Sequence, residues 1–162
     1  MSQYDSPKKS IYGLYKHLHA MDLVYGKKKD ILRSLFIGEN WTWRIVKISK
    51  AVVIECKNNN FEKPARRFQR HHADENEWKK TASAMLEGEL MSFDEWVSYV
   101  ENHEKTYLLT NEEHENWNKC SEKLILYDLN LEQNLFRNTD RGWQHGKKEE
   151  EFIRKLVATH KL

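Results

Sequence analysis

The chain has 162 residues, and its 27 lysines and arginines against 25 acidic residues give a formal net charge of +2. Hydrophobic residues make up 39% and charged residues 32%, a composition typical of one folded, water-soluble domain. No apolar run approaches the roughly 20 residues of a membrane-spanning helix, and the first residues lack the apolar core of a secretory signal. We therefore expect a cytoplasmic protein with no membrane partner. The two cysteines, Cys56 and Cys120, are too few for a four-cysteine zinc site.

Residues 1–40 are predicted to form two helices. Ser10 is a suitable N-cap for a first helix that runs to about Tyr25, and Gly26 is expected to end it. A second helix is predicted from about Lys28 to Ile37. Apolar residues recur at helical spacing in both segments, and we expect them to face the core: Ile11, Leu14, Tyr15, Leu18, Met21, Ile31, Leu32, Leu35 and Phe36.

The next segment contains the first predicted strand. Residues 41–48 are rich in aromatic and β-branched side chains, which favour an extended conformation. Residues 49–57 fit two structures equally well. They can extend the sheet, or Ser49 can cap a short helix that turns Val52, Val53 and Cys56 inward.

A basic run leads into a pair of histidines. Arg66, Arg67 and Arg70 precede or adjoin His71 and His72, and the run is predicted to be a short strand that ends in a loop. Residues 75–104 follow as a predicted helical insertion, with one helix at 77–87 and a second one opened by a serine capping box at 92–95.

A second strand and a third histidine come after the insertion. Residues 106–109 are predicted to be a short strand, and Thr110 with Glu113 forms another capping box. The helix that this box opens carries His114 in its first turn, and we expect it to continue to about Leu124. Residues 127–162 are predicted to contain a polar stretch at 137–146 and a final amphipathic helix.

The histidines and arginines suit phosphodiester hydrolysis. This reaction needs a base that accepts a proton from water, and neutral imidazole does so near pH 7. A divalent ion can stabilise the negative charge, and neutral histidine is a ligand for such ions. Because neighbouring residues of a strand point to opposite faces, one histidine of the pair can face a metal while the other faces a substrate.

The order of strand, His-His, strand, threonine cap and Glu-His resembles the HNH nucleases, which have the ββα-metal fold. The resemblance rests on residues 70–72 and 108–114 and covers about residues 41–124. It implies an α+β fold that is mostly helical, with a small antiparallel sheet around a ββα-metal unit. The chain would be one domain, with N-terminal helices at 1–40, an HNH-like core at 41–126 that contains the insertion at 75–104, and a C-terminal segment at 127–162.

The resemblance also implies a divalent-metal-dependent endonuclease that acts on DNA. His72 would be the general base, and His71 and His114 would be metal ligands. Mg²⁺ is the first expectation for the ion, with Mn²⁺, Ni²⁺ and Zn²⁺ as alternatives. Cutting of both strands of a duplex would favour a homodimer.

Four further side chains are expected to contact the nucleic acid. Arg67 and Arg70 would hold the scissile strand with Arg66 beside them, because guanidinium groups pair with phosphate in a fork. Asn118 lies four residues after His114, on the same face of the expected helix, and would touch phosphate or orient a ligand.

The chain departs from the HNH pattern at one important position. Lys105 stands where the middle Asn of the motif is expected, and the span from His71 and His72 to His114 is longer than usual. These departures keep two other classes of function open. One is a catalytically inactive nucleic-acid-binding or protein-interaction domain, and the other is a structural helical module with solvated histidines.

Overall fold

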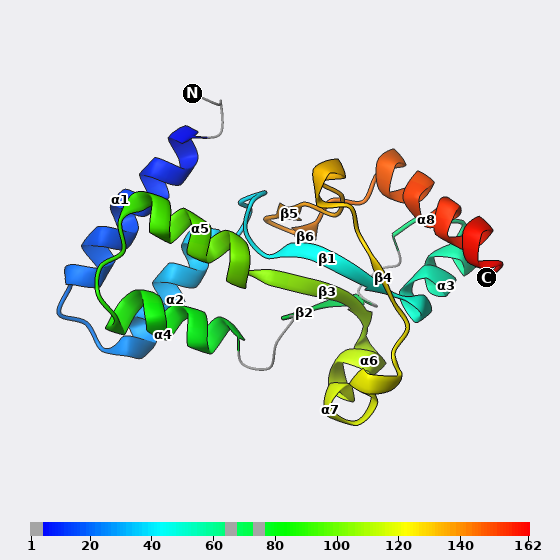
Figure 1. Ribbon diagram of the computed structural model, residues 1–162, viewed down its shortest axis with the longest axis horizontal. Helices are drawn as coiled ribbons and strands as arrows, with labels where there is room; N and C mark the ends of the chain where they lie inside the picture. Colours follow the sequence, from blue (N-terminus) through cyan, green and yellow to red (C-terminus); the bar gives the residue numbers. More distant parts are fainter. Residues whose placement is uncertain (1–4, 64–67, 73–76) are drawn as a thin grey trace.

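The computed structural model describes residues 5–63, 68–72 and 77–162, and Figure 1 shows a group of helices beside a small sheet that has its own helices. The helices are α1 (Asp5–Ala20), α2 (Tyr25–Phe36), α3 (Lys50–Asn58), α4 (Glu77–Glu87), α5 (Phe93–His103), α6 (Asn111–Glu115), α7 (Trp117–Cys120) and α8 (Lys147–His160). The strands are β1 (Arg44–Ser49), β2 (Phe68–His72), β3 (Lys105–Thr110), β4 (Leu126–Asp128), β5 (Asn138–Thr139) and β6 (Gly142–Trp143). Two short 3₁₀ turns, η1 (Ser121–Lys123) and η2 (Leu131–Gln133), complete the described elements.

The main sheet has the strand order β2-β3-β1-β4. β2 runs antiparallel to β3 and pairs His72 with Thr106, and β4 runs antiparallel to β1. β1 and β3 are parallel, because the long connection between them crosses from one end of the sheet to the other. The predicted α+β class is confirmed, and the sheet is mixed where an antiparallel one was expected.

The N-terminal helices and the helices of the insertion share one core. α1 and α2 pack with α4 and α5, so the predicted insertion at 75–104 joins the N-terminal helices in a single bundle (Figure 1). Trp96 has no exposed surface, and its ring contacts those of Tyr12, Tyr15, Phe36 and Trp41. The buried members of this core include Tyr15, Leu32, Phe36, Trp41, Trp43, Met85, Trp96 and Val100.

A second core fills the space between the sheet and the helices α3 and α8. Its buried members are Ile45, Ile48, Val52, Val53, Cys56, Phe68, Leu108, Leu129, Leu135, Phe136 and Ile153. Ser49 ends β1 and caps α3, since its hydroxyl oxygen accepts a hydrogen bond from the Val52 amide at 3.2 Å. The helical alternative for residues 49–57 is therefore the one that the chain adopts.

Both predicted capping boxes are present. The Ser92 hydroxyl oxygen accepts from the Glu95 amide, and the Glu95 carboxylate accepts from the Ser92 amide. Thr110 and Glu113 make the same reciprocal pair, at 3.2 and 2.9 Å. Glu113 also accepts a hydrogen bond from the Ser49 hydroxyl at 2.6 Å. The second box thereby fixes the start of α6 to the end of β1, next to the end of β3.

Several predicted boundaries were wrong for local reasons. The first helix is α1 at 5–20 instead of 10–25, and Gly26 lies inside α2. Residues 41–43 are not part of the strand, because Trp43 has a φ of 46°, a left-handed conformation that an extended strand excludes. The helix expected from Thr110 to Leu124 breaks at Asn116, whose φ and ψ of −103° and 15° interrupt the regular hydrogen bonding.

Residues 126–143 contain strands that the sequence did not predict. β4 has three residues and β5 and β6 have two each, too few to show an alternating apolar pattern. β4 is held by β1, which is distant in sequence, whereas β5 and β6 pair with each other. Within the described residues, none of the helices combines the length and apolar character that a membrane crossing needs.

Candidate metal and phosphate site

The strands β2 and β3 and the helix α6 bring two of the predicted histidines together. β2 presents His71 on the face of the sheet that α6 covers, while β3 runs straight into the cap at Thr110. Because His114 is in the first turn of α6, its ring is held against the neighbouring strand. The contact joins residues 43 positions apart in the sequence.

The two imidazoles have the spacing of a pair of metal ligands. Nδ1 of His71 lies 3.1 Å from Nδ1 of His114, with ring centroids 5.2 Å apart and ring planes at 73°. Two nitrogens that are each about 2.1 Å from one ion are about 3.0 Å apart at a right angle and about 3.4 Å apart in a tetrahedron. The observed distance also fits a direct hydrogen bond, in which one ring donates its Nδ1–H to the other.

The surroundings of His71 favour its neutral form. Burial, and then the positive charge that His114 can carry, lower the pKa of His71, so its uncharged, ligand-competent form is favoured. The Trp117 ring lies over His71 with centroids 4.2 Å apart, and Tyr107 extends this aromatic wall. Nε2 of His71 is buried and has no hydrogen-bond partner among the described residues.

The donor set fits a divalent transition metal. Among the described residues no group of three or more His, Cys, Asp or Glu side chains gathers at one point, so His71 and His114 would supply two ligands. The remaining positions would be open to water or substrate, as in catalytic metal sites. Imidazole suits Zn²⁺ and Ni²⁺, and oxygen ligands suit Mg²⁺ and Mn²⁺. The two imidazoles therefore rank Zn²⁺ and Ni²⁺ ahead of the Mg²⁺ expected from the resemblance.

His72 lies on the opposite face of β2 from His71. Its Nδ1 is 3.9 Å from Oε2 of Glu104, a carboxylate that is buried at the residue before β3. Burial lowers the pKa of His72 to about 4, with further lowering from the nearby positive charges of His71, Arg33 and Arg70. The ring is therefore neutral near pH 7 and able to accept a proton.

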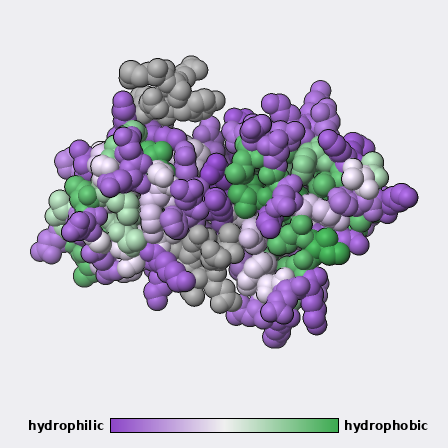
Figure 2. All heavy atoms as spheres, in the orientation of Figure 1, coloured by the Kyte–Doolittle hydropathy of each residue, from purple (hydrophilic) through white to green (hydrophobic). Residues whose placement is uncertain are grey.

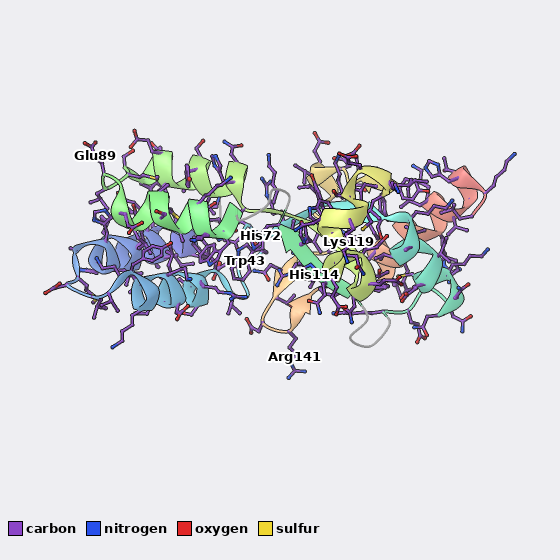
Figure 3. All side chains as sticks on the ribbon, turned by 90° about the horizontal axis from the view of Figure 1, so that it is seen from below. Trp43, His72, Glu89, His114, Lys119 and Arg141 are labelled. Carbon is purple, nitrogen blue, oxygen red and sulfur yellow. The ribbon has the colours of Figure 1, made fainter. Side chains whose placement is uncertain are left out.

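A cavity of about 260 Å³ opens beside His72, between the helical bundle and the sheet. Its walls include Arg33 of α2, Arg70 of β2 and three indoles, those of Trp43, Trp78 and Trp143. Figure 3 shows Trp43 and His72 at this junction, and His114 further along the sheet. The two faces of β2 thus carry two different groups of side chains.

Arg70 is held rigidly in the wall of this cavity. Its Nη1 donates to Oδ1 of Asn138 at 2.7 Å, and its guanidinium lies 5.5 Å from the centre of the Trp43 ring. Asn138 is itself buried and donates to Phe36 O at 2.9 Å and to Thr42 Oγ1 at 3.1 Å. Burial, and then the charge of Arg33, lower the pKa of Arg70 to about 10. Arg70 remains positive at neutral pH in a position prepared for an anion.

Among the other predicted contacts, only Asn118 is described, and it does not join either group. Arg66 and Arg67 lie outside the described residues. Asn118 is exposed in α7, and the helix break at Asn116 removes the continuous face that would have aligned it with His114. Lys105, at the position of the HNH asparagine, is the first residue of β3 and is half-buried.

Some side chains of the site could not be identified from the sequence. Glu104, Trp117 and Asn138 each lie in segments whose local pattern shows only a helix end, an apolar face or a polar stretch. Their roles depend on contacts with His72, His71 and Arg70, which are distant along the chain. Of these three residues, only Trp117 had a local signal for a place near the site, because it is a large aromatic residue three positions after His114.

A larger cavity lies elsewhere in the described part of the chain and lacks these chemical groups. It has a volume of about 760 Å³ and lies between α8 and the segment after β4, with walls that include Asp128, Lys148 and Glu151. Figure 2 shows hydrophilic residues over most of one face, with hydrophobic patches on both halves of the molecule. Size alone therefore does not locate the candidate site.

The low pKa of His72 predicts a specific loss of stability in acid. Its ordinary value is 6.5 and its folded value is about 4, so the unfolded chain takes up the proton first as the pH falls. Stability contributed by the neutral ring is complete above about pH 6.5 and is lost between about pH 6.5 and 4, by roughly 2–3 kcal/mol. Urea unfolding at pH 7 and pH 4.5 measures the change. The free energy of unfolding should fall less between these pH values in His72→Gln than in the wild type. The exposed His17→Gln should behave as the wild type, and equal losses in all three proteins would contradict the burial effect.

Comparison with known proteins finds no matching family model, no significantly similar curated protein and no significantly similar solved structure. The resemblance to HNH nucleases consequently rests on the residues named above and on their arrangement. Two features of the structure are relevant to this resemblance. The antiparallel strands β2 and β3 are followed by α6, and His71 contacts His114.

Proposed function

We propose that the protein is a divalent-metal-dependent endonuclease that hydrolyses DNA phosphodiester bonds in the manner of HNH nucleases. The observation that carries the proposal is the 3.1 Å approach of the His71 and His114 Nδ1 atoms where β3 runs into α6. This spacing fits two adjacent ligands of one ion, and the strand-strand-helix order is the one that the resemblance implies.

In this proposal His71 and His114 hold the ion and His72 is the general base. A divalent ion bound by these two residues would supply positive charge to stabilise the transition state and the leaving oxygen. His72 is neutral at pH 7 and accepts the proton of the attacking water, while the Glu104 carboxylate 3.9 Å away favours the protonated ring that results. β2 is an edge strand, so groups on both of its faces can approach a strand of DNA that crosses its end.

The arginines would bind the phosphates of that strand. Arg70 and Arg33 lie on the His72 side of β2, and Arg66, Arg67 and Asn118 remain proposed contacts to the backbone. Such contacts make binding fall steeply as salt is added. A homodimer would place two sites on a duplex with matching symmetry, and sedimentation with and without DNA tests that proposal.

Cleavage of supercoiled plasmid tests the proposed function. Wild-type protein should nick the plasmid in the presence of at least one of Mn²⁺, Ni²⁺, Zn²⁺ or Mg²⁺, and EDTA should stop the reaction. His72→Ala should lower the rate by about 10²–10⁴-fold, the contribution of a positioned acid or base. His17→Ala removes an exposed histidine and should leave the rate unchanged. A His72→Ala protein that cuts as fast as the wild type would remove His72 as the base.

One arrangement favours the second candidate function, a nucleic-acid-binding domain without catalysis. His71 and His72 face opposite sides of β2, with the Trp117 ring stacked over the first and Glu104 beside the second. On this reading the histidines hold the strands together and the arginines bind phosphate. The plasmid would then be retarded in a gel, in a salt-dependent way, and would stay intact with every metal.

A further inference from the structure

The cavity beside His72 is built to receive an anion. The polar side chains in its described walls are those of arginine, histidine, glutamine, threonine and tryptophan, all of which can donate hydrogen bonds. No aspartate or glutamate is among the described residues that line it. Nε1 of Trp43 and Nε1 of Trp143 are buried and have no hydrogen-bond partner within the described part of the chain.

The positive charge around the cavity is only partly balanced. Arg70 is bound by the neutral amide of Asn138, and Arg33 makes no ion pair with another described residue. Lys63 lies 4.1 Å from the centre of the Trp143 ring, and burial and the charge of Arg70 lower its pKa. The Glu104 carboxylate is buried, with its Oε2 3.9 Å from Nδ1 of His72. Arg70 is half-buried, whereas Arg33 and Lys63 are exposed. A half-buried cation without a counterion is costly, and an anion bound at Arg70 would offset that cost.

The aromatic walls indicate a ligand that carries a planar ring in addition to a phosphate group. Trp43, Trp78 and Trp143 all line the cavity, and planar rings with apolar faces stack well on nucleobases. Trp43 is buried and has a φ of 46°, a strained conformation for a bulky side chain. Strain of this kind concentrates at ligand sites, where the surrounding structure holds a residue in position for binding.

We propose that this cavity binds one nucleoside phosphate, with the phosphate held by Arg33 and Arg70 and the base against the tryptophans. Its volume of about 260 Å³ lies just below the usual range of about 300–1,000 Å³ for small-molecule sites, so it suits one nucleotide and no more. The ligand is a free nucleotide or an unpaired nucleotide of a strand. The choice of a nucleic-acid ligand rests on the proposed function, whereas the anion site rests on the cavity itself.

The test is a titration in EDTA, without metal, followed by tryptophan fluorescence. dAMP should bind and change the emission, and deoxyadenosine and inorganic phosphate should each bind at least fivefold more weakly. Arg33→Gln should lower the affinity for dAMP at least fivefold. Arg141→Gln makes the same charge change on an exposed side chain that points away from the molecule in Figure 3, and should bind as the wild type. Circular dichroism confirms that both variants are folded.

The outcomes separate the two proposals. Loss of plasmid cleavage in His114→Ala with unchanged dAMP binding supports a site that is independent of the metal. No cleavage by any protein, with dAMP binding that depends on Arg33, would remove the nuclease and keep the nucleotide site. Equal affinity for phosphate and dAMP, or no effect of Arg33→Gln, would overturn the inference. A single-stranded (dA)₅ that binds more tightly than dAMP identifies a strand as the source of the nucleotide, and weaker binding identifies the free nucleotide.

Discussion

His114→Ala is expected to weaken binding of Zn²⁺ or Ni²⁺ by at least about 100-fold. Loss of a group that only orients a metal ligand costs about 10–100-fold in affinity, so loss of a ligand itself costs more. His71 would remain as one ligand on β2, opposite a gap where the second Nδ1 stood 3.1 Å away. Isothermal titration calorimetry at pH 7.5 with each metal measures the change directly.

The controls for this experiment are present in the same chain. His17 is exposed on α1, and His17→Ala removes an imidazole without touching the pair. Asn118→Ala changes the side chain four residues after His114, which the break at Asn116 separates from it. Both variants should bind metal with wild-type affinity. If His114→Ala also binds as the wild type, the contact between the two rings is a plain hydrogen bond and not a metal site.

Trp96→Ala is expected to destabilise the fold by about 3–5 kcal/mol, the cost of a large cavity in an aromatic core. Trp96 has no exposed surface, and its ring lies 5.5 Å from Trp41, 5.6 Å from Tyr12 and 5.7 Å from Tyr15. For a chain of this length the melting temperature should fall by about 6–20 °C. Thermal unfolding followed by circular dichroism measures the shift.

A smaller aromatic change tests the reason for this loss. Trp96→Phe keeps one ring in the core and also removes an indole N–H that has no hydrogen-bond partner among the described residues. It should cost less than half as much as the alanine change. Val24→Ala is the surface control, since Val24 is 69% exposed. A loss below about 1 kcal/mol for Trp96→Ala would mean that the bundle does not depend on this ring.

The features that could be predicted from the sequence are those set by residues a few positions apart. Ser92 and Thr110 are followed three positions later by glutamate, and this spacing alone fixes where α5 and α6 begin. The start of α6 placed His114 in its first turn. That His71 and His114 would meet was expected from the resemblance to HNH nucleases, in which both would be metal ligands.

Features that depend on distant partners could not be predicted. Arg70 and Asn138 are 68 residues apart, and Asn138 sits in a two-residue strand that has no pattern of its own. Glu104 is buried where α5 ends and β3 begins. The break at Asn116 has no proline or glycine to announce it. These contacts arise from the tertiary fold, which overrides weak local preferences.

The rate of plasmid nicking as a function of metal concentration, in wild-type protein and in His114→Ala, tests the central claim most directly. We predict a rate that rises and saturates with metal in the wild type, and a rate lower by about 10³-fold in the variant, equivalent to about 4 kcal/mol of lost transition-state stabilisation. Equal rates and equal metal dependence in the two proteins would contradict the claim that His71 and His114 hold a catalytic ion.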